Sequence, residues 1–315
     1  MTSSGSLWMK ILLQSPRDEH EAWRAALSAA LPAATIVAWP NTLAAPDYAL
    51  VFKPPPELFA ATRPTRAIFN LGAGVDALLG VPTLPDGIPV IRLEDAGMAP
   101  QMVEYVALAV LGAYRESHEY AAQQYEGRWQ PRALLPKSQF GVGILGFGVL
   151  GQAVAAALAP FGFPIRGWSA GRKEVPGVES FTGISELRPF LASSRVLVCL
   201  LPSTRETRNL LDKANLSHLP RGAHLVNVAR GDIVVDEDLV ALLDEGHLAG
   251  ATLDVFRVEP LPSNHPFWHH PKVTLTPHTS AVTVIDDSVA QIVGKIRQLE
   301  QGQPVTGVVD RSRGY

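Results

Sequence analysis

The stretch FGVGILGFGVLG (residues 140–151) decides the fold. A short apolar run leads into Gly146, Gly148 and Gly151 in the spacing G-x-G-x-x-G, and QAVAAALA, a run of helix-favouring residues, follows. A strand that turns sharply into a helix at glycines is typical of dinucleotide-binding domains, because the backbone there approaches a pyrophosphate and the free N–H groups of the helix attract its charge. We therefore expect a nucleotide site at this turn. The alternative is a glycine-rich turn with a purely structural purpose.

The composition is that of a globular protein. The 315 residues are 47% hydrophobic and 18% charged with a formal net charge of −3, and this length permits two domains. No basic excess predicts a nucleic-acid partner, and no apolar run approaches the ~20 residues that span a bilayer. MTSSGSLWMK at the start lacks the pattern of a signal peptide. The single cysteine, Cys199, lies in an apolar run and suits a reducing compartment, so we expect a cytoplasmic protein with no membrane association.

Strand-like runs alternate with helical or turn-rich pieces along the chain, which predicts parallel sheets with helices on their faces. Residues 8–93 contain WMKILLQS, TIVAW, YALVF, RAIFNLG and PVIRL, and residues 140–280 contain FGVGILG, PIRGWS, RVLVCLLP, AHLVNVAR, GATLDVF and KVTLTPH. A long helix is expected over Gln101–Gln124 and links the two units; an irregular arm with Trp129 follows it. A last helix over Asp286–Gln301 is expected to return to the first unit.

We therefore predict an α/β protein with two doubly wound parallel-sheet domains. A Rossmann dinucleotide-binding domain (99–281) is inserted in a flavodoxin-like substrate-binding domain, which is formed by residues 1–98 and 282–315.

Three polar residues follow strand-like runs of the second unit. Arg230 comes after HLVNVA, Glu259 shortly after TLDVF, and His278 after VTLTP. Ligands of open α/β sheets bind beyond the carboxyl ends of the strands, so we expect these side chains on the rim that faces the nucleotide. An arginine binds a carboxylate through two hydrogen bonds, and a histidine oriented by a carboxylate exchanges a proton with a reacting oxygen. Together they suit the reduction of a 2-oxo acid, whereas each alone is consistent with a solvated charge or a turn cap.

The motifs FGVGILGFGVLG, NVARG, LDVFRVEPLP and TPHTS occur in this order. With them the chain resembles the D-isomer-specific 2-hydroxyacid dehydrogenases over nearly its whole length. LGAGVDALL, RLEDAGM and the closing VVDRSRGY resemble, more narrowly, the bacterial glyoxylate/hydroxypyruvate reductases of the A type. The resemblance implies that Arg230 binds the substrate carboxylate and carbonyl, that His278 is the general acid and base, and that Glu259 is the partner of His278.

The resemblance implies further site residues. Backbone N–H groups of Ala73 and Gly74, in LGAGVD, are expected at the substrate carboxylate, and Asp254 is expected at the nicotinamide amide. A plain turn is the alternative for LGAGVD. The other residues expected around the cofactor are Met102, Val149, Leu150, Leu201, Pro202, Val228, Ala229 and His278.

The end of PIRGWS, the second strand-like run of residues 140–280, indicates which nicotinamide cofactor is bound. An acidic residue about 20 positions beyond the glycines accepts the ribose hydroxyls in NAD sites. Here Ser169 ends PIRGWS, and Arg172 and Lys173 follow. A neutral hydroxyl and two cations suit a 2′-phosphate, which predicts NADPH, with NADH as a weaker substitute. Alternatively, the two cations are ordinary solvated charges of a loop.

Two places depart from the pattern of these relatives. After the strand YALV, relatives carry Trp-His at a position that faces the substrate, and this chain carries Phe52 and Lys53. A lysine there suits a second anionic group, hence a larger or dicarboxylic substrate, or it reaches solvent over an apolar wall. The arm around Trp129 also varies. The resemblance suggests a homodimer built through the nucleotide domains, with Trp129 near the partner's active site, at the interface or in the core.

We therefore predict an enzyme that reduces glyoxylate to glycolate and hydroxypyruvate to D-glycerate with NADPH. The alternatives are a dehydrogenase of another 2-oxo acid, such as a D-lactate-like enzyme, and a nucleotide-sensing binding protein without activity. No metal site is expected, because prolines interrupt the histidines of HPFWHHP. Asp236 and Asp238 are expected to begin a helix.

Overall fold

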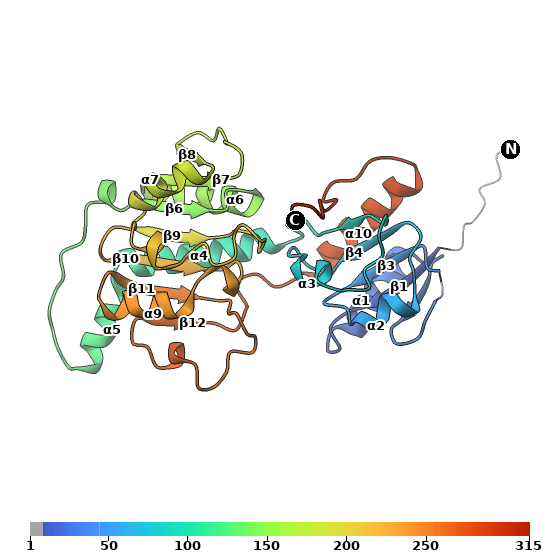
Figure 1. The fold of residues 1–315 in the computed structure, drawn as a ribbon, viewed down its shortest axis with the longest axis horizontal. Helices are drawn as coiled ribbons and strands as arrows, with labels where there is room; N and C mark the ends of the chain where they lie inside the picture. Colours follow the sequence, from blue (N-terminus) through green and yellow to red (C-terminus); the bar gives the residue numbers. More distant parts are fainter. Residues whose placement is uncertain (1–8, 44) are drawn as a thin grey trace. The chain divides into compact units, whose positions relative to one another are not determined.

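The computed structural model describes residues 9–43 and 45–315, and the chain divides into two compact units (Figure 1). Unit 1 comprises Met1–Met98 and Thr283–Tyr315, and unit 2 comprises Ala99–Val282. Most of the segment MTSSGSLWMK, and Trp8 at the start of the first expected strand, lie outside the described residues.

Unit 1 is built on a parallel sheet of five strands in the order β2-β1-β3-β4-β5. This is the flavodoxin-like order, in which the direction of winding reverses between β1 and β3 and leaves a crevice at that switch point. The central strands β3 and β4 are buried on both faces, as expected of a parallel sheet covered by helices. The strands are β1 (Lys10–Gln14), β2 (Thr35–Ala38), β3 (Tyr48–Val51), β4 (Ala67–Asn70) and β5 (Val90–Ile91).

Four α-helices lie in the described part of unit 1. The last of them, α10, packs against α1, which confirms the predicted return of the C-terminal helix to the first unit. The helix pair is amphipathic: buried Leu27 and Trp23 lie on α1, and Ile292 and Ile296 lie on α10. The helices are α1 (His20–Ala30), α2 (Pro56–Ala61), α3 (Asp76–Leu79) and α10 (Ile285–Glu300).

Unit 2 is built on a parallel sheet of seven strands in the order β12-β11-β10-β9-β6-β7-β8. Six of them reproduce the doubly wound dinucleotide-binding order, with its switch point between β6 and β9, and β12 extends the sheet at one edge. The strands are β6 (Val142–Leu145), β7 (Ile165–Ser169), β8 (Val178–Thr182), β9 (Val196–Cys199), β10 (Ala223–Asn227), β11 (Leu248–Leu253) and β12 (Val273–Leu275).

Helices cover both faces of this sheet (Figure 1). Alternate residues of the strands pack with α4 and α6 into one core cluster, and the intervening residues, including the buried Cys199, pack with α7, α8 and α9 into another. The α-helices are α4 (Met98–Tyr114), α5 (Ser117–Tyr125), α6 (Val149–Leu158), α7 (Leu187–Ala192), α8 (Lys213–Leu216) and α9 (Asp236–Asp244). The 3-10 helices are η1 (Lys137–Gln139), η2 (Ala159–Phe161), η3 (Ile184–Glu186), η4 (Gly231–Ile233) and η5 (Pro266–Trp268).

The structure corrects two expectations for unit 2. The predicted six strands are seven, because the edge strand β8 is only half-buried and its sequence VESFT contains no continuous apolar run. The single helix expected over Gln101–Gln124 is two helices. It is interrupted at Glu116, whose φ of 54° lies in the left-handed region and ends the α-helical path of α4.

The predicted α/β class with two doubly wound parallel sheets is confirmed. Asp236 begins α9 as expected, with three acidic residues in its first turn. No helix within residues 9–43 and 45–315 combines the length and the apolar character that a membrane span requires.

Candidate active site

The β6–α6 turn has a backbone that only glycine accommodates. Gly146 has a φ of 109°, and a Cβ there would lie 2.5 Å from the carbonyl carbon of Leu200, which follows the neighbouring strand β9. A Cβ at Gly151 would lie 2.4 Å from the carbonyl oxygen of Gly146, so this glycine permits α6 to pack against its own strand. A Cβ at Gly148 would meet nothing within 4 Å. The first and third glycines are thus structural requirements, and the second keeps the space in front of the helix open.

The N-terminus of α6 suits a pyrophosphate. The helix begins at Val149 after Gly148, whose position has no side-chain cap, and its first turn contains no acidic residue. Its first N–H groups therefore have no partner within the helix and carry the positive end of the helix dipole. Together with the open space at Gly148, this cradle fits the diphosphate of a dinucleotide.

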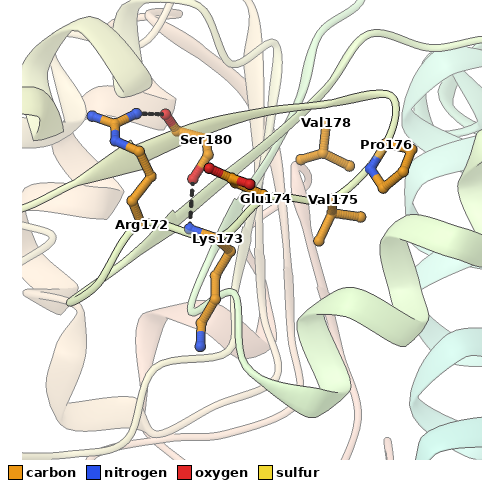
Figure 2. Close-up of a pocket in the computed structure, with 7 residues that line it drawn as sticks. All are labelled: Arg172, Lys173, Glu174, Val175, Pro176, Val178 and Ser180. Atoms are coloured by element: carbon orange, nitrogen blue, oxygen red, sulfur yellow. Dashed lines mark hydrogen bonds between the residues drawn. The ribbon is translucent and has the colours of Figure 1, made fainter.

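The end of β7 presents the hydroxyl of Ser169, and the loop that follows contributes two cations, Arg172 and Lys173, which Figure 2 shows. The Ser169 hydroxyl donates to the carbonyl of Gly171 over 2.8 Å, which fixes the turn into the following loop. Arg172 donates to the carbonyl of Ser180 over 2.5 Å and forms an ion pair with Glu186 of 2.5 Å, so the guanidinium is held beside the loop. Arg172 and Lys173 line a surface hollow of about 530 Å³, and their side chains point in different directions.

The three predicted polar residues follow three adjacent strands of the seven-stranded sheet. Arg230 follows β10, Glu259 follows β11 and His278 follows β12, and these strands pair in parallel. Their carboxyl ends therefore meet at one edge of the sheet, which is the edge that also carries the β6–α6 turn.

Glu259 and His278 form a hydrogen-bonded pair. Oε2 of Glu259 lies 2.8 Å from Nδ1 of His278, while Oε1 accepts from the backbone N–H of Phe256 over 3.1 Å. The carboxylate is thus fixed by its own loop and in turn orients the imidazole. With Nδ1 occupied, Nε2 is the nitrogen of His278 that is left for a reacting group.

His278 stands in a strained loop that a buried carboxylate holds in place. Its φ is 54°, and its backbone N–H donates to the carbonyl of Asp254 over 2.8 Å. The Asp254 side chain, fully buried, accepts from the hydroxyl of Thr276 at 2.5 Å and from the N–H groups of Thr279 and Ser280 at 2.8 Å each. Residues on either side of His278 are therefore bound to one side chain, which offsets the cost of the left-handed backbone.

The position of Arg230 is determined by a buried asparagine. Asn227, at the end of β10, donates from Nδ2 to the carbonyl of Arg230 over 3.0 Å and accepts from the N–H of Ala229 over 3.2 Å. The next residue, Gly231, has no room for a side chain, since a Cβ would lie 1.9 Å from the carbonyl carbon of Phe256. Arg230 itself is half-buried and donates from Nη1 to the carbonyl of Ala229 over 2.7 Å.

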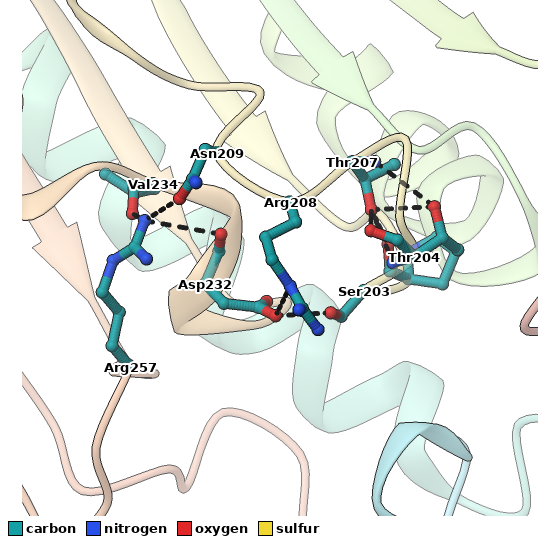
Figure 3. A network of polar contacts seen from close by, with 9 residues as sticks. Ser203, Thr204, Thr207, Arg208, Asn209, Asp232, Val234 and Arg257 are labelled. Carbon is teal, nitrogen blue, oxygen red and sulfur yellow. Dashed lines mark hydrogen bonds and ion pairs between the residues drawn. The ribbon is translucent and has the colours of Figure 1, made fainter. Parts of the chain in front are cut away.

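A polar network ties together the loops that surround this edge (Figure 3). Oδ2 of Asp232 accepts from the hydroxyl of Ser203 at 2.7 Å and from Nε of Arg208 at 3.2 Å. On the other side, Arg257 donates to Oδ1 of Asn209 over 2.5 Å and to the carbonyl of Val234. The loop after β9, the turn that follows Arg230 and the loop after β11 are thereby held as one assembly.

Unit 1 contains the other predicted substrate residues, at the carboxyl edge of its own sheet. Phe52 and Lys53 follow β3, and Ala73 and Gly74 follow the neighbouring strand β4. The buried Asn70 donates from Nδ2 to the carbonyls of Gly72 at 2.8 Å and Gly74 at 3.0 Å. The loop is thus curled around one side chain.

The remaining predicted residues differ in exposure. Met102 is only 5% exposed and packs within the core cluster of α4 and α6, so a role in cofactor binding stays a prediction. Trp129 is 97% exposed, and the alternative that placed it in the core is wrong. The others lie on the glycine turn or directly after β9 and β10: Val149, Leu150, Leu201, Pro202, Val228 and Ala229. Within the described part of the chain, no three histidine, cysteine, aspartate or glutamate side chains gather as a metal site would require.

The sequence reasoning missed the residues that organise these loops. Asn70, Asn227 and Thr276 each bind loop atoms or the carboxylate that holds the loop, and Tyr105 of α4 extends the last of these contacts, with its hydroxyl 2.6 Å from that of Thr276. A signal was present for two of them, because an asparagine at the end of a strand commonly hydrogen-bonds the turn that follows it.

Comparison with known proteins identifies the family. Residues 107–280 match the family described as D-isomer specific 2-hydroxyacid dehydrogenase, NAD binding domain. The glyoxylate/hydroxypyruvate reductase A of Salmonella typhi is 47% identical over 98% of this chain and 100% of its own length. Two of the similar solved structures each cover 98% of this chain. A D-isomer specific 2-hydroxyacid dehydrogenase from Xanthobacter autotrophicus Py2, in complex with NADPH and MES, is 41% identical over 99% of its own length, with a TM-score of 0.92.

The second structure is the NADPH-dependent glyoxylate/hydroxypyruvate reductase of Sinorhizobium meliloti, in complex with NADP and sulfate. It is 33% identical over 100% of its own length, with a TM-score of 0.90. The family match covers more than half of the chain, and the relatives align with it over nearly its whole length. The chain belongs to the D-isomer specific 2-hydroxyacid dehydrogenases and is an NAD(P)-dependent oxidoreductase.

Proposed function

We propose that the protein reduces small 2-oxo acids with NADPH, converting glyoxylate to glycolate and hydroxypyruvate to D-glycerate. The observation that carries the proposal is the 2.8 Å pair of Glu259 and His278 on the sheet edge where Arg230 also stands. The names of the curated relatives and the NADPH- and NADP-containing structures support the same substrates and cofactor.

Each of the three side chains has a distinct role in the proposed reaction. The Arg230 guanidinium binds the substrate carboxylate and polarises the carbonyl oxygen, because its fork of donors matches two oxygens. His278 donates the proton from Nε2 to that oxygen, and Glu259 orients the ring. NADPH, when bound, supplies the hydride to the carbonyl carbon. The backbone N–H groups of Ala73 and Gly74 are the further anchors that we propose for the carboxylate.

The glycine turn and the β7 loop would hold the cofactor. The first turn of α6 binds the pyrophosphate, and Arg172 and Lys173 bind the 2′-phosphate that distinguishes NADPH from NADH. Ser169 supports this choice, because a neutral hydroxyl does not repel that phosphate as a carboxylate would. The resemblance implies that Asp254 binds the nicotinamide amide. Since three donors already engage its two oxygens, we propose that its main role is to position the loop of His278.

The direct test follows NADPH consumption with glyoxylate, hydroxypyruvate and pyruvate, with NADH in parallel. We expect turnover of the first two substrates at a higher kcat/KM than pyruvate. Preference for pyruvate would instead favour the D-lactate-like alternative, and NADPH binding without turnover of any 2-oxo acid would favour a nucleotide-sensing protein. The cytoplasmic location and the homodimer stay predictions from the sequence.

Cofactor selectivity has its own test. Arg172→Ala removes a cation from the proposed phosphate site, so we expect the KM for NADPH to rise about tenfold and the KM for NADH to change little. Arg205→Ala is the matched control, because Arg205 is 94% exposed on another loop of unit 2. Equal changes for both cofactors in Arg172→Ala would overturn the assignment.

A further inference from the structure

The loop after β3 occupies the ligand-binding position of the five-stranded sheet. In the order β2-β1-β3-β4-β5 the winding reverses between β1 and β3, and the crevice at such a switch point lies beyond the carboxyl ends of those two strands. Phe52 and Lys53 are the first residues beyond β3. They are joined to the end of β1, since the Phe52 N–H donates to the backbone carbonyl and to Oε1 of Gln14, each over 2.9 Å.

This loop has few hydrogen-bond donors other than the Lys53 ammonium. The N–H of Phe52 is already used by Gln14, and the three residues after Lys53 are the prolines Pro54, Pro55 and Pro56, which have no N–H. A backbone cradle for an anion, like the one at α6, is therefore absent from this part of the loop. The Lys53 ammonium is therefore the charged donor that this part of the loop offers to an anion.

The backbone holds Lys53 in an unusual conformation. Its φ of 45° lies in the left-handed region, which is disfavoured for a residue with a Cβ and further disfavoured before a proline. Residues in such regions gather at ligand sites, where the surroundings compensate the strain.

The Phe52 ring lies between Lys53 and the loop that follows β4 in the chain of contacts. Nζ is 5.6 Å from the centroid of the Phe52 ring, and that ring lies 3.8 Å from the position of a Cβ on Gly72. Gly72 begins the loop whose Ala73 and Gly74 we propose as carboxylate anchors. Lys53 is exposed, and no carboxylate within residues 9–43 and 45–315 forms an ion pair with it. The ammonium therefore has no carboxylate counter-ion among the described residues, and the ring beneath it borders the loop of the proposed carboxylate anchors.

We infer that Lys53 binds a second anionic group of the substrate, so that the enzyme also accepts 2-oxo acids with a carboxylate or a phosphate at the far end. This inference rests on the proposed reduction of 2-oxo acids and specifies the substrate class of that same site. The reaction at the carbonyl is unchanged, and Lys53 acts by charge and position. In the alternative, the ammonium only caps the face of the Phe52 ring in solvent.

The test compares pairs of substrates that differ in the second charge. Oxaloacetate is paired with 2-oxobutyrate, and phosphohydroxypyruvate with hydroxypyruvate, so the two pairs distinguish a carboxylate from a phosphate. The readout, within each pair, is the ratio of kcat/KM for the substrate with the second anionic group to kcat/KM for the substrate without it. We expect Lys53→Met to lower this ratio about tenfold in at least one pair and Lys53→Arg to retain most of it.

Lys10→Met is the matched control. Lys10 is an exposed lysine of the same sheet, at the start of β1 and hence at the opposite edge, and we expect its substitution to leave the ratio unchanged. The ratio in the unmodified enzyme also falls with rising ionic strength if an exposed cation selects the dianion. This measurement stands in for Lys53→Met if that variant does not fold.

The outcomes separate the two proposals. Turnover of glyoxylate with a ratio that neither Lys53→Met nor salt alters overturns the inference about Lys53 and leaves the proposed function intact. The absence of turnover with any 2-oxo acid overturns the proposed function itself. A dianion that is not reduced at all by the unmodified enzyme, while glyoxylate is, also overturns the role of Lys53.

Discussion

The carboxyl edges of the two sheets are built differently. In unit 2 the edge presents side chains that exchange protons or bear charge, and each is fixed by a short contact, such as the 2.8 Å pair of Glu259 and His278. In unit 1 the loop after β4 is curled around the buried Asn70, and Lys53 after β3 is one of the exposed cations of the edge. We propose that the same strand-to-helix architecture serves reaction chemistry in one unit and anchoring in the other. The substitutions below separate these two roles.

The largest effect is expected at the proposed proton donor of unit 2. His278→Ala removes the proposed general acid, so we expect kcat for glyoxylate reduction to fall by about a thousandfold, while the dissociation constant of NADPH changes far less. His269→Ala is the matched control, because His269 is an exposed histidine that the site does not use. Steady-state kinetics and a fluorescence titration of NADPH measure the two quantities. A kcat within tenfold of the unmodified enzyme would remove His278 from the mechanism.

Substitutions in the β6–α6 turn test whether the stability and the cofactor binding of unit 2 depend on its backbone. Gly146→Ala places a Cβ against Leu200 at a positive φ, so the free energy of unfolding falls by about 3 kcal/mol or more. Gly148→Ala meets no neighbouring atom, and we expect it to lower stability by less than about 0.5 kcal/mol while it weakens NADPH binding. Chemical denaturation and cofactor titration compare the two. Equal stability losses would contradict the division of roles between these glycines.

Asn70→Ala tests the anchoring role of unit 1. The substitution leaves the carbonyls of Gly72 and Gly74 without their donor, so we expect a loss of about 1–3 kcal/mol in stability. The KM for glyoxylate is expected to rise about tenfold, with a smaller change in kcat, because the loop loses its shape. Asn215→Ala is the control, since Asn215 donates in the same way to the carbonyl of Leu210 in unit 2. If kcat fell alone, the loop would belong to the chemistry and not to anchoring.

The smallest effect concerns a histidine away from the edge. Burial lowers the pKa of His224 to about 3, and the His118 ring stacked 6.1 Å away adds to this shift. The unfolded chain, in which a histidine titrates near ~6.5, then binds more protons between these values. The stability that the neutral His224 contributes is therefore fully present above about pH 6.5 and is lost as the pH falls toward 3. The free energy of unfolding changes there with a slope of up to about 1.4 kcal/mol per pH unit.

Urea denaturation at a series of pH values measures this slope. His224→Gln keeps a polar group near Thr252, which lies 3.0 Å from the imidazole, and removes the titration, so we expect a shallower slope. A slope that is the same in both proteins would assign the acid sensitivity to other groups.

Local patterns sufficed to predict much of the fold and to single out the candidate reactive residues. The glycine spacing predicted the β6–α6 turn, because two of its glycines have no room for a Cβ, and a steric requirement leaves a fixed signature. Arg230, Glu259 and His278 were found from their places after apolar runs. The edge strand β8 and the interruption at Glu116 were missed, because half-buried strands lack an apolar run and one left-handed residue changes no periodicity.

By itself, the sequence determined the α/β class, the nucleotide-binding turn and the residue types at the strand ends, since each depends on contacts between near neighbours in the chain. Only the tertiary structure decided how those residues are held. Asp254 and Thr276, or Glu259 and His278, are separated by about twenty positions and meet only because parallel strands align their carboxyl ends. Such contacts depend on the order and register of the strands. A periodic pattern along the sequence does not reveal which distant side chains the fold brings within hydrogen-bond reach of each other.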